Sequence, residues 1–143
     1  RALEAFPEVK CAISGFPGTR GLDCATIYPI KRSDTSLTGK SCCPAPFGTT
    51  PMGEAVLSAG IDLLSVDKQR RIILVLTDGK PNDTHKAIHA RQVLNGLGIE
   101  VLGLVIGGNP AYPTNVFDQS VFVTDVADLP RELLTLVQNL LKH

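Results

Sequence analysis

The sequence predicts an α/β fold in which helices cover both faces of a mostly parallel sheet, a doubly wound arrangement with an antiparallel hairpin at its edge. Two continuous apolar runs, residues 72–77 and 99–106, are typical of strands buried on both faces in the middle of a parallel sheet. Segments with helical spacing of apolar residues alternate with these runs. Two segments of alternating polarity near the N-terminus predict the hairpin.

The N-terminal residues predict the end of a helix followed by this hairpin. Residues 1–6 have the composition of a last helical turn, and Pro7 stops it. Residues 8–14 alternate between apolar and polar side chains, as a strand does, and residues 22–30 do the same. Phe16-Pro17-Gly18 predicts a turn between them.

A long polar loop, residues 31–48, leads to the first complete helix. Thr50 has the side chain of an N-cap, and Pro51 suits the first helical position. Apolar residues then recur at helical spacing and predict one buried stripe: Met52, Val56, Ala59 and Leu63.

Strands and helices alternate in the C-terminal half of the chain. The strand over residues 72–77 is followed by a helix that we expect Thr84 to cap and that closes near Gly96 and Gly98. The second apolar run, residues 99–106, is the next strand.

The last elements are a short strand and a helix. Residues 107–110 (Gly-Gly-Asn-Pro) predict an irregular crossing, and residues 120–124 predict the strand. Pro130 lies near the start of the final helix, whose apolar positions are Leu133, Val137, Leu140 and Leu141. Right-handed crossovers in such a chain place helices on both faces of the sheet.

Composition argues against nucleic-acid and membrane partners. The 143 residues include 14 basic and 14 acidic side chains, so there is no basic excess for an anionic surface. No apolar run approaches the roughly 20 residues that span a bilayer. Because the chain begins at Arg1, we expect it to be one domain cut from a longer protein.

Four cysteines point to a reducing, cytoplasmic compartment. Cys11, Cys24, Cys42 and Cys43 lack the spacing of a disulfide framework, and we expect Cys11 and Cys24 to pack as small apolar side chains. A zinc or redox role for the adjacent Cys42-Cys43 pair is an open alternative, although no second pair completes a four-ligand set.

Asp78 and Thr50 are the residues most suited to bind a ligand. Ligands of doubly wound sheets bind at the carboxyl ends of the strands. Asp78 follows a strand directly, and the loop before Thr50 should rise to the same edge. A carboxylate and a hydroxyl are hard oxygen ligands for Mg²⁺, Mn²⁺ or Ca²⁺. The alternative is that both residues are ordinary caps of a turn and a helix.

Three stretches of sequence resemble the von Willebrand factor A (VWA) domain, a Rossmann-like fold. Gly-Thr-Thr-Pro-Met-Gly-Glu-Ala over residues 48–55 is similar to the second motif of that family. Ile-Ile-Leu-Val-Leu-Thr-Asp-Gly-Lys-Pro-Asn-Asp over 72–83 is similar to the third. Val-Phe-Val-Thr-Asp-Val-Ala-Asp-Leu-Pro-Arg-Glu-Leu over 121–133 resembles the closing strand and helix. The resemblance covers residues 1–143 as a single domain.

The resemblance implies a metal-ion-dependent adhesion site (MIDAS), at which a divalent cation bridges two proteins. The residues that match its metal ligands are Thr50 and Asp78, and the candidates for contacts around them are Thr49, Gly79, Asn82 and Asp83. The sequence of the third motif is similar to that of bacterial VWA domains that accompany AAA+ ATPases. Two types are the most similar: the T subunit of cobalt chelatase (cobaltochelatase), which belongs to cobalamin biosynthesis, and the nitric oxide reductase activation protein D. The partner it implies is an AAA+ subunit or a metalloprotein client with a carboxylate, and the module is not an enzyme.

The first motif of the family, Asp-x-Ser-x-Ser at the end of the central strand, is absent from these residues. The nearest wording, Asp34-Thr35-Ser36, has no apolar strand before it. We therefore expect a sheet that lacks its first strand and a cation, Mg²⁺ or Mn²⁺, that binds weakly or not at all without it. Two readings compete with the interaction module: a Mg²⁺-dependent phosphotransferase or hydrolase, and a VWA scaffold without metal.

Two other patterns resemble known sites only superficially. Residues 34–41 nearly match a phosphate-binding loop, but Asp34 replaces its first glycine and prolines follow where a helix is needed. His85 and His89 lie four residues apart on a helix, yet Lys86 stands where a zinc protease needs glutamate. We expect both histidines to be exposed.

Overall fold

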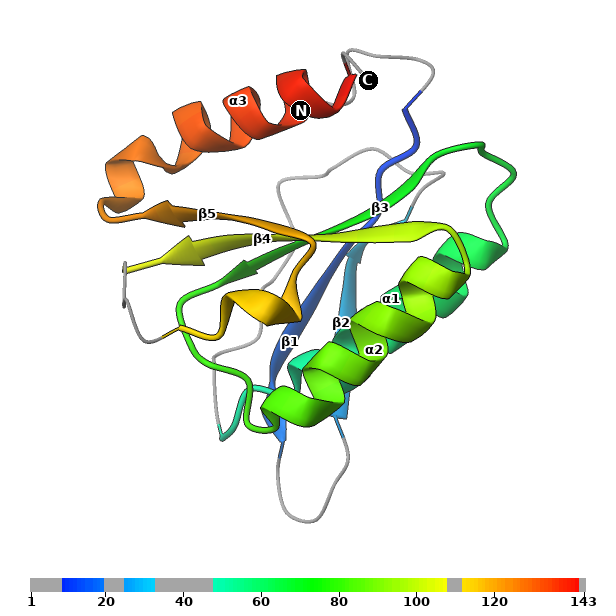
Figure 1. Cartoon of the computed structure of the whole chain (residues 1–143), viewed down its shortest axis with the longest axis horizontal. Coiled ribbons are helices and arrows are strands. Elements are labelled where there is room, and N and C mark those ends of the chain that lie inside the picture. Colours follow the sequence, from blue (N-terminus) through cyan, green and yellow to red (C-terminus); the bar gives the residue numbers. More distant parts are fainter. Residues whose placement is uncertain (1–8, 20–24, 33–47, 108–111, 142–143) are drawn as a thin grey trace. The chain divides into compact units, whose positions relative to one another are not determined.

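The computed structural model describes residues 9–19, 25–32, 48–107 and 112–141 (Figure 1). The chain divides into two compact units, Arg1–Pro51 and Met52–His143. The predicted helix end at residues 1–6, the phosphate-loop-like residues 34–41 and the side chains of Cys24, Cys42 and Cys43 lie outside the described residues.

The first unit contains the predicted antiparallel hairpin. Strand β1 (Ile13–Thr19) pairs with β2 (Ala25–Lys31). The prediction of a strand over 8–14 was wrong in position, because the strand includes the expected Phe16-Pro17-Gly18 turn. The pairing register shifts between Gly15 and Gly18. A bulge tolerates Pro17, which has no N–H for the ladder.

The side chains at the base of this hairpin are only partly as expected. Cys11 is a free thiol and is half-buried rather than fully buried. The ammonium group of Lys31 is buried, and its Nζ donates hydrogen bonds to the carbonyl oxygens of Cys11 (2.8 Å) and Arg32 (3.1 Å). These bonds offset the cost of removing the charge from water.

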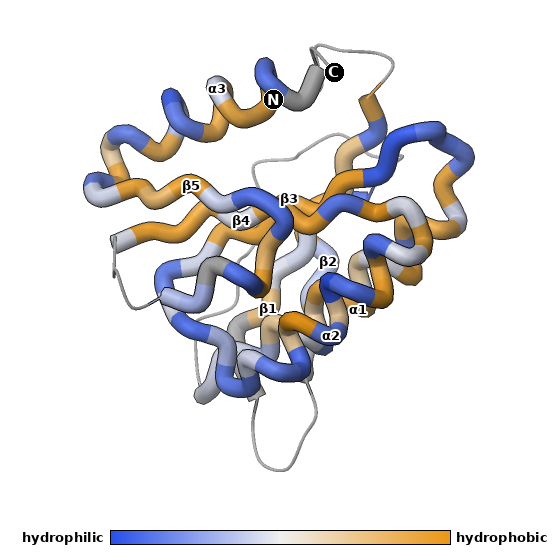
Figure 2. The backbone as a smooth tube through the Cα atoms, in the orientation of Figure 1, coloured by the Kyte–Doolittle hydropathy of each residue, from blue (hydrophilic) through white to orange (hydrophobic). Residues whose placement is uncertain are grey.

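The second unit is built on a parallel three-stranded sheet, as the apolar runs predict. The strand order is β3 (Arg71–Thr77), β4 (Ile99–Ile106) and β5 (Gln119–Val123). Each predicted strand is confirmed to within one residue at either end. Figure 2 shows these strands as the most apolar part of the unit.

Helices cover both faces of this sheet, which confirms the doubly wound arrangement. Helices α1 (Met52–Leu64) and α2 (Thr84–Gly96) pack together on one face, and α3 (Leu129–Leu141) lies on the other (Figure 1). Two short 3₁₀ helices, Thr114–Val116 and Val126–Asp128, flank β5. Within the described residues, no helix has the length and apolar character needed to cross a bilayer.

Strand β4 is the centre of the hydrophobic core. Val101 and Val105 on one face are 1% exposed, and Leu102 and Leu104 on the other are fully buried. Asp118, just before β5, connects this strand to α2. Its carboxylate accepts hydrogen bonds from Val101 N (2.8 Å), Asn95 Nδ2 (2.7 Å) and Arg91 Nη1 (3.4 Å).

The buried stripe of α1 differs from the predicted one because α2 approaches it closely. Met52 and Val56 are buried as expected, whereas Ala59 and Leu63 are only half-buried. Gly53 and Gly60 lie at the crossing instead. A Cβ on Gly53 would be 2.9 Å from the backbone carbonyl carbon of Lys86, and one on Gly60 would clash with the side chain of Leu94.

The ends of α2 confirm its predicted extent but correct its cap. Asp83, not Thr84, is the N-cap, because its carboxylate accepts the amide of Lys86 at 3.0 Å. Carboxylates suit this position because they accept a hydrogen bond from an amide that has no partner within the helix. Their negative charge also interacts favourably with the positive end of the helix dipole. At the other end, Gly98 has a φ of 73°, which glycine adopts readily.

Candidate metal site at the carboxyl edge of the sheet

Asp78 lies where the sequence predicts a ligand site. It is the first residue after β3, and the carboxyl ends of all three parallel strands lie on the same side of the sheet (Figure 1). The side chain is exposed, and it forms no hydrogen bond or ion pair with any residue that the structure describes. Its carboxylate oxygens are therefore accessible to a hard cation.

The turn that carries Asp78 is fixed by the hydroxyl of Thr77. Thr77 is 7% exposed, and its Oγ1 donates to the carbonyl oxygen of Gly79 at 2.9 Å and accepts from the Gly79 amide at 3.2 Å. These two bonds close the backbone around Asp78. Gly79 thus shapes this turn through its backbone, and its role beside a cation stays a prediction.

Tyr112 is a residue of this edge that the sequence reasoning missed. It is 5% exposed, and its hydroxyl donates a hydrogen bond to Met52 Sδ at 3.9 Å. Burial raises the pKa of Tyr112 to about 12, and the nearby Thr77 side chain opposes part of that rise. Its position in the connection between β4 and β5 was an available signal, because loops after parallel strands return to the ligand edge.

Thr50 belongs to the first unit, so its predicted convergence with Asp78 stays a prediction. It is half-buried and lies two residues before α1 begins. Pro51 is the residue directly before the helix. Thr50 therefore lies one position further from the helix than the N-cap position that was predicted for it. Thr49, the neighbouring candidate, is exposed and also belongs to the first unit.

Asn82 and Asp83 differ in how far they can support a metal site. The carboxylate of Asp83 is already used to cap α2, which gives it a structural role. Asn82 is exposed in the loop between Asp78 and that cap. Its role beside a cation stays a prediction.

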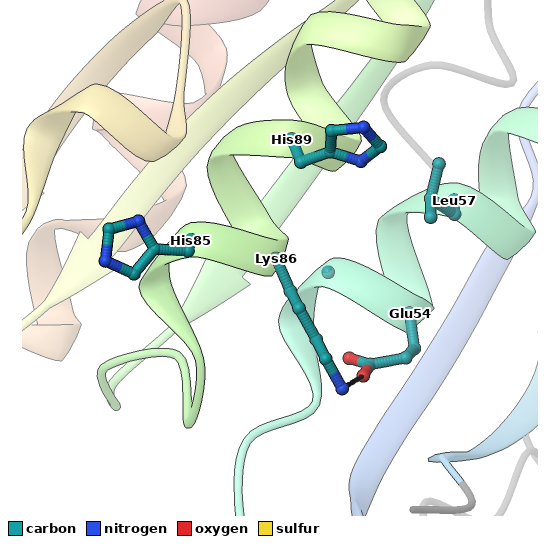
Figure 3. Close-up of a pocket in the computed structure, with 6 residues that line it drawn as sticks. Glu54, Leu57, His85, Lys86 and His89 are labelled. Carbon is teal, nitrogen blue, oxygen red and sulfur yellow. Dashed lines mark hydrogen bonds and ion pairs between the residues drawn. The ribbon is translucent and has the colours of Figure 1, made fainter.

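His85 and His89 are exposed, as expected, and do not face one another. They line a pocket of about 290 Å³ between α1 and α2 together with Gly53, Glu54, Leu57 and Lys86. In Figure 3 the two rings point to different sides of α2, and Lys86 forms a 3.2 Å ion pair with Glu54. In the described parts of the chain, no three His, Cys, Asp or Glu side chains gather to hold a metal.

Comparisons with known proteins add one distant likeness. No protein-family model and no curated protein matches the sequence. Among solved structures, the crystal structure of the manganese-loaded TRAP protein of Plasmodium vivax is similar, with 17% identity and a TM-score of 0.45. The match covers 68% of this chain and 48% of that chain, so it spans about half the length of the related structure. A likeness at this level does not define a family.

Proposed function

We propose that the chain is a VWA-type protein-interaction module that holds Mg²⁺ or Mn²⁺ through Asp78 and Thr50. The observation that carries this proposal is the exposed carboxylate of Asp78 at the carboxyl edge of a parallel sheet, which has no partner among the residues that the structure describes. The resemblance of residues 48–55 and 72–83 to two adhesion-site motifs supports it.

The donor set present fits a hard cation. Asp78 contributes negative charge, and Thr50 contributes a neutral oxygen that orients the ion. A cation bound there keeps a coordination position open for a carboxylate of a partner protein. In this proposal the partner is an AAA+ ATPase subunit or its metalloprotein client in metal-chelatase or metalloenzyme-activation machinery, and the location is the cytoplasm.

Binding rather than catalysis also suits the side chains at this edge. A hydrolase or phosphotransferase needs a nucleophile or general base beside the metal. Tyr112 keeps its proton at neutral pH, as tyrosines ordinarily do, and burial raises its pKa further, to about 12. We assign no catalytic residue to this edge and propose that the module is not an enzyme.

The test is Mn²⁺-induced broadening of backbone NMR signals in the 143-residue chain. With two protein ligands we expect weak binding, with a Kd on the order of 10⁻⁴ to 10⁻³ M, the range of weak calcium sites. Signals of residues 78–79 and of Thr50 should broaden selectively, because the paramagnetic ion acts only on nearby nuclei. A longer chain that supplies an Asp-x-Ser-x-Ser strand before Arg1 should bind more tightly.

The matched pair of variants is Asp78→Ala and Asp67→Ala. Asp67 is also exposed, but it lies in the loop that leads into the amino end of β3. Selective broadening should disappear in Asp78→Ala and persist in Asp67→Ala. Broadening that is equal in both variants, or that spares residues 78–79 from the start, would contradict the metal site and favour the metal-free scaffold.

A further inference from the structure

Strand β3 lies at the edge of the parallel sheet, although its composition is that of a central strand. It pairs with β4 on one side, and no strand among the described residues pairs with its other side. Alternate residues of β3 therefore point their backbone N–H and C=O groups toward an open edge. Residues 72–76 (Ile-Ile-Leu-Val-Leu) contain no lysine or proline, the residues that often protect such an edge from pairing.

The two faces of β3 are covered to different extents. The odd-numbered residues within 73–77 are at most 8% exposed. On the opposite face, Ile72 and Leu74 are half-buried, and Leu76 is 42% exposed. A further strand at this edge would pair with the free backbone groups and would also place its own side chains beside these apolar ones. The edge thus offers hydrogen bonds and apolar contacts together.

The charged residues at the two ends of β3 favour one arrangement of a second, identical strand. Arg70 precedes β3, and its side chain is 39% exposed beside Glu100 of β4. Asp78 follows β3 with an exposed carboxylate. In a parallel pair in register, each of these charges would face its own like charge, which is destabilising. In an antiparallel pair centred on Leu74, each Arg70 lies opposite Asp78 of the second copy, and opposite charges across strands are stabilising.

This antiparallel register is consistent along the whole strand. Leu74 lies opposite Leu74 of the second copy, Ile72 opposite Leu76, and Arg71 opposite Thr77. Facing residues are separated by an even number of positions, so they point their backbone groups to the same edge and their side chains to the same face. A two-fold axis at Leu74 generates this contact. It joins two three-stranded sheets into one continuous sheet.

We propose that two copies of this chain associate through the open edges of β3, antiparallel and centred on Leu74. The proposal does not rest on the metal site, although Asp78 belongs to both. The experiments are therefore carried out in EDTA, so that no cation competes for the carboxylate. Failure of the dimer and failure of the metal site are then separate results.

Sedimentation equilibrium of the 143-residue chain is the first experiment. From about 1 μM to about 1 mM protein, we expect a reversible equilibrium between monomer and dimer. Species larger than a dimer would overturn the proposal, because a two-fold contact closes with two copies. A monomer at every concentration would also overturn it and would leave the edge open to a strand of another protein.

An exchange of charges tests the register. Arg70→Asp turns two attractive pairs into repulsive ones and should raise the Kd of the dimer by at least about ten-fold. The double variant Arg70→Asp/Asp78→Arg restores opposite charges and should recover most of the affinity. The matched control is Arg131→Asp, because Arg131 also forms surface ion pairs but lies on α3. An unchanged Kd in Arg70→Asp, or no recovery in the double variant, would overturn the register.

Amide hydrogen exchange locates the contact. The amides of β3 that point away from β4 should exchange more slowly as the protein concentration rises. Strand β5, at the opposite edge of the same sheet, is an internal control whose outward amides should not respond to concentration. Protection that rises at β5 and not at β3 would place the dimer contact elsewhere and overturn the proposal.

Discussion

At the scale of single residues, burial of Tyr112 should make the folded chain less stable at alkaline pH. Its pKa rises from 10.0 to about 12 on folding because the ring is buried. Below pH 10 the folded and unfolded chains both keep this proton. Between about pH 10 and 12 the unfolded chain loses the proton while the folded chain retains it, so the free energy of unfolding should fall.

Urea unfolding measured at intervals from pH 9 to pH 12 tests this expectation. The decline above pH 10 should be smaller in Tyr112→Phe than in the unaltered chain. The matched control is Tyr28→Phe, because Tyr28 is 39% exposed and lies in the hairpin. If both variants reduce the decline equally, the alkaline sensitivity does not come from burial of Tyr112.

Among the elements, the crossing of α1 and α2 makes a sharp prediction about glycine. Gly53→Ala should lower the free energy of unfolding by about 1–3 kcal/mol, because its Cβ would meet the backbone of Lys86, which cannot rotate away. Gly96→Ala, at the end of α2, has open space around it. There, alanine should be neutral or stabilising by up to about 1 kcal/mol, because it favours helix.

Chemical denaturation of the two variants under the same conditions gives the comparison. Both substitutions add one methyl group to a helical glycine, so the difference between them isolates the contact with Lys86. A destabilisation of Gly96→Ala as large as that of Gly53→Ala would show that helix packing at this crossing is looser than the structure indicates.

The parts of the fold that the sequence predicts well are those fixed by local pattern. The apolar runs located β3 and β4 within one residue, because strands buried on both faces have few alternatives. The hairpin was misplaced, because Phe16-Pro17-Gly18 has turn composition but lies in a bulged strand. Local composition does not reveal how two strands align.

Tertiary contacts explain the other errors. Gly53 lies at the crossing of α1 and α2, whereas helical spacing predicts larger residues on the buried face of α1. The spacing in α1 alone does not predict the crossing, because how closely α2 approaches depends on the residues of both helices. For the candidate site, the end of a buried strand predicts an exposed Asp78. Tyr112 is 34 positions further along the chain, and only the folded connection between β4 and β5 brings it to Thr77.

For the whole molecule, the balance of charge predicts a solubility minimum near pH 7. The 14 basic and 14 acidic side chains cancel, so long-range repulsion between molecules is weakest there. The net charge of the chain is positive below this pH and negative above it, because the isoelectric point of the sequence is about 7.0. Solubility in polyethylene glycol, measured from pH 5 to 9, should therefore be lowest near neutrality.

Lys10→Glu changes the net charge by two at an exposed position and should shift the minimum to lower pH. A minimum that does not move would show that apolar surface, rather than net charge, controls association.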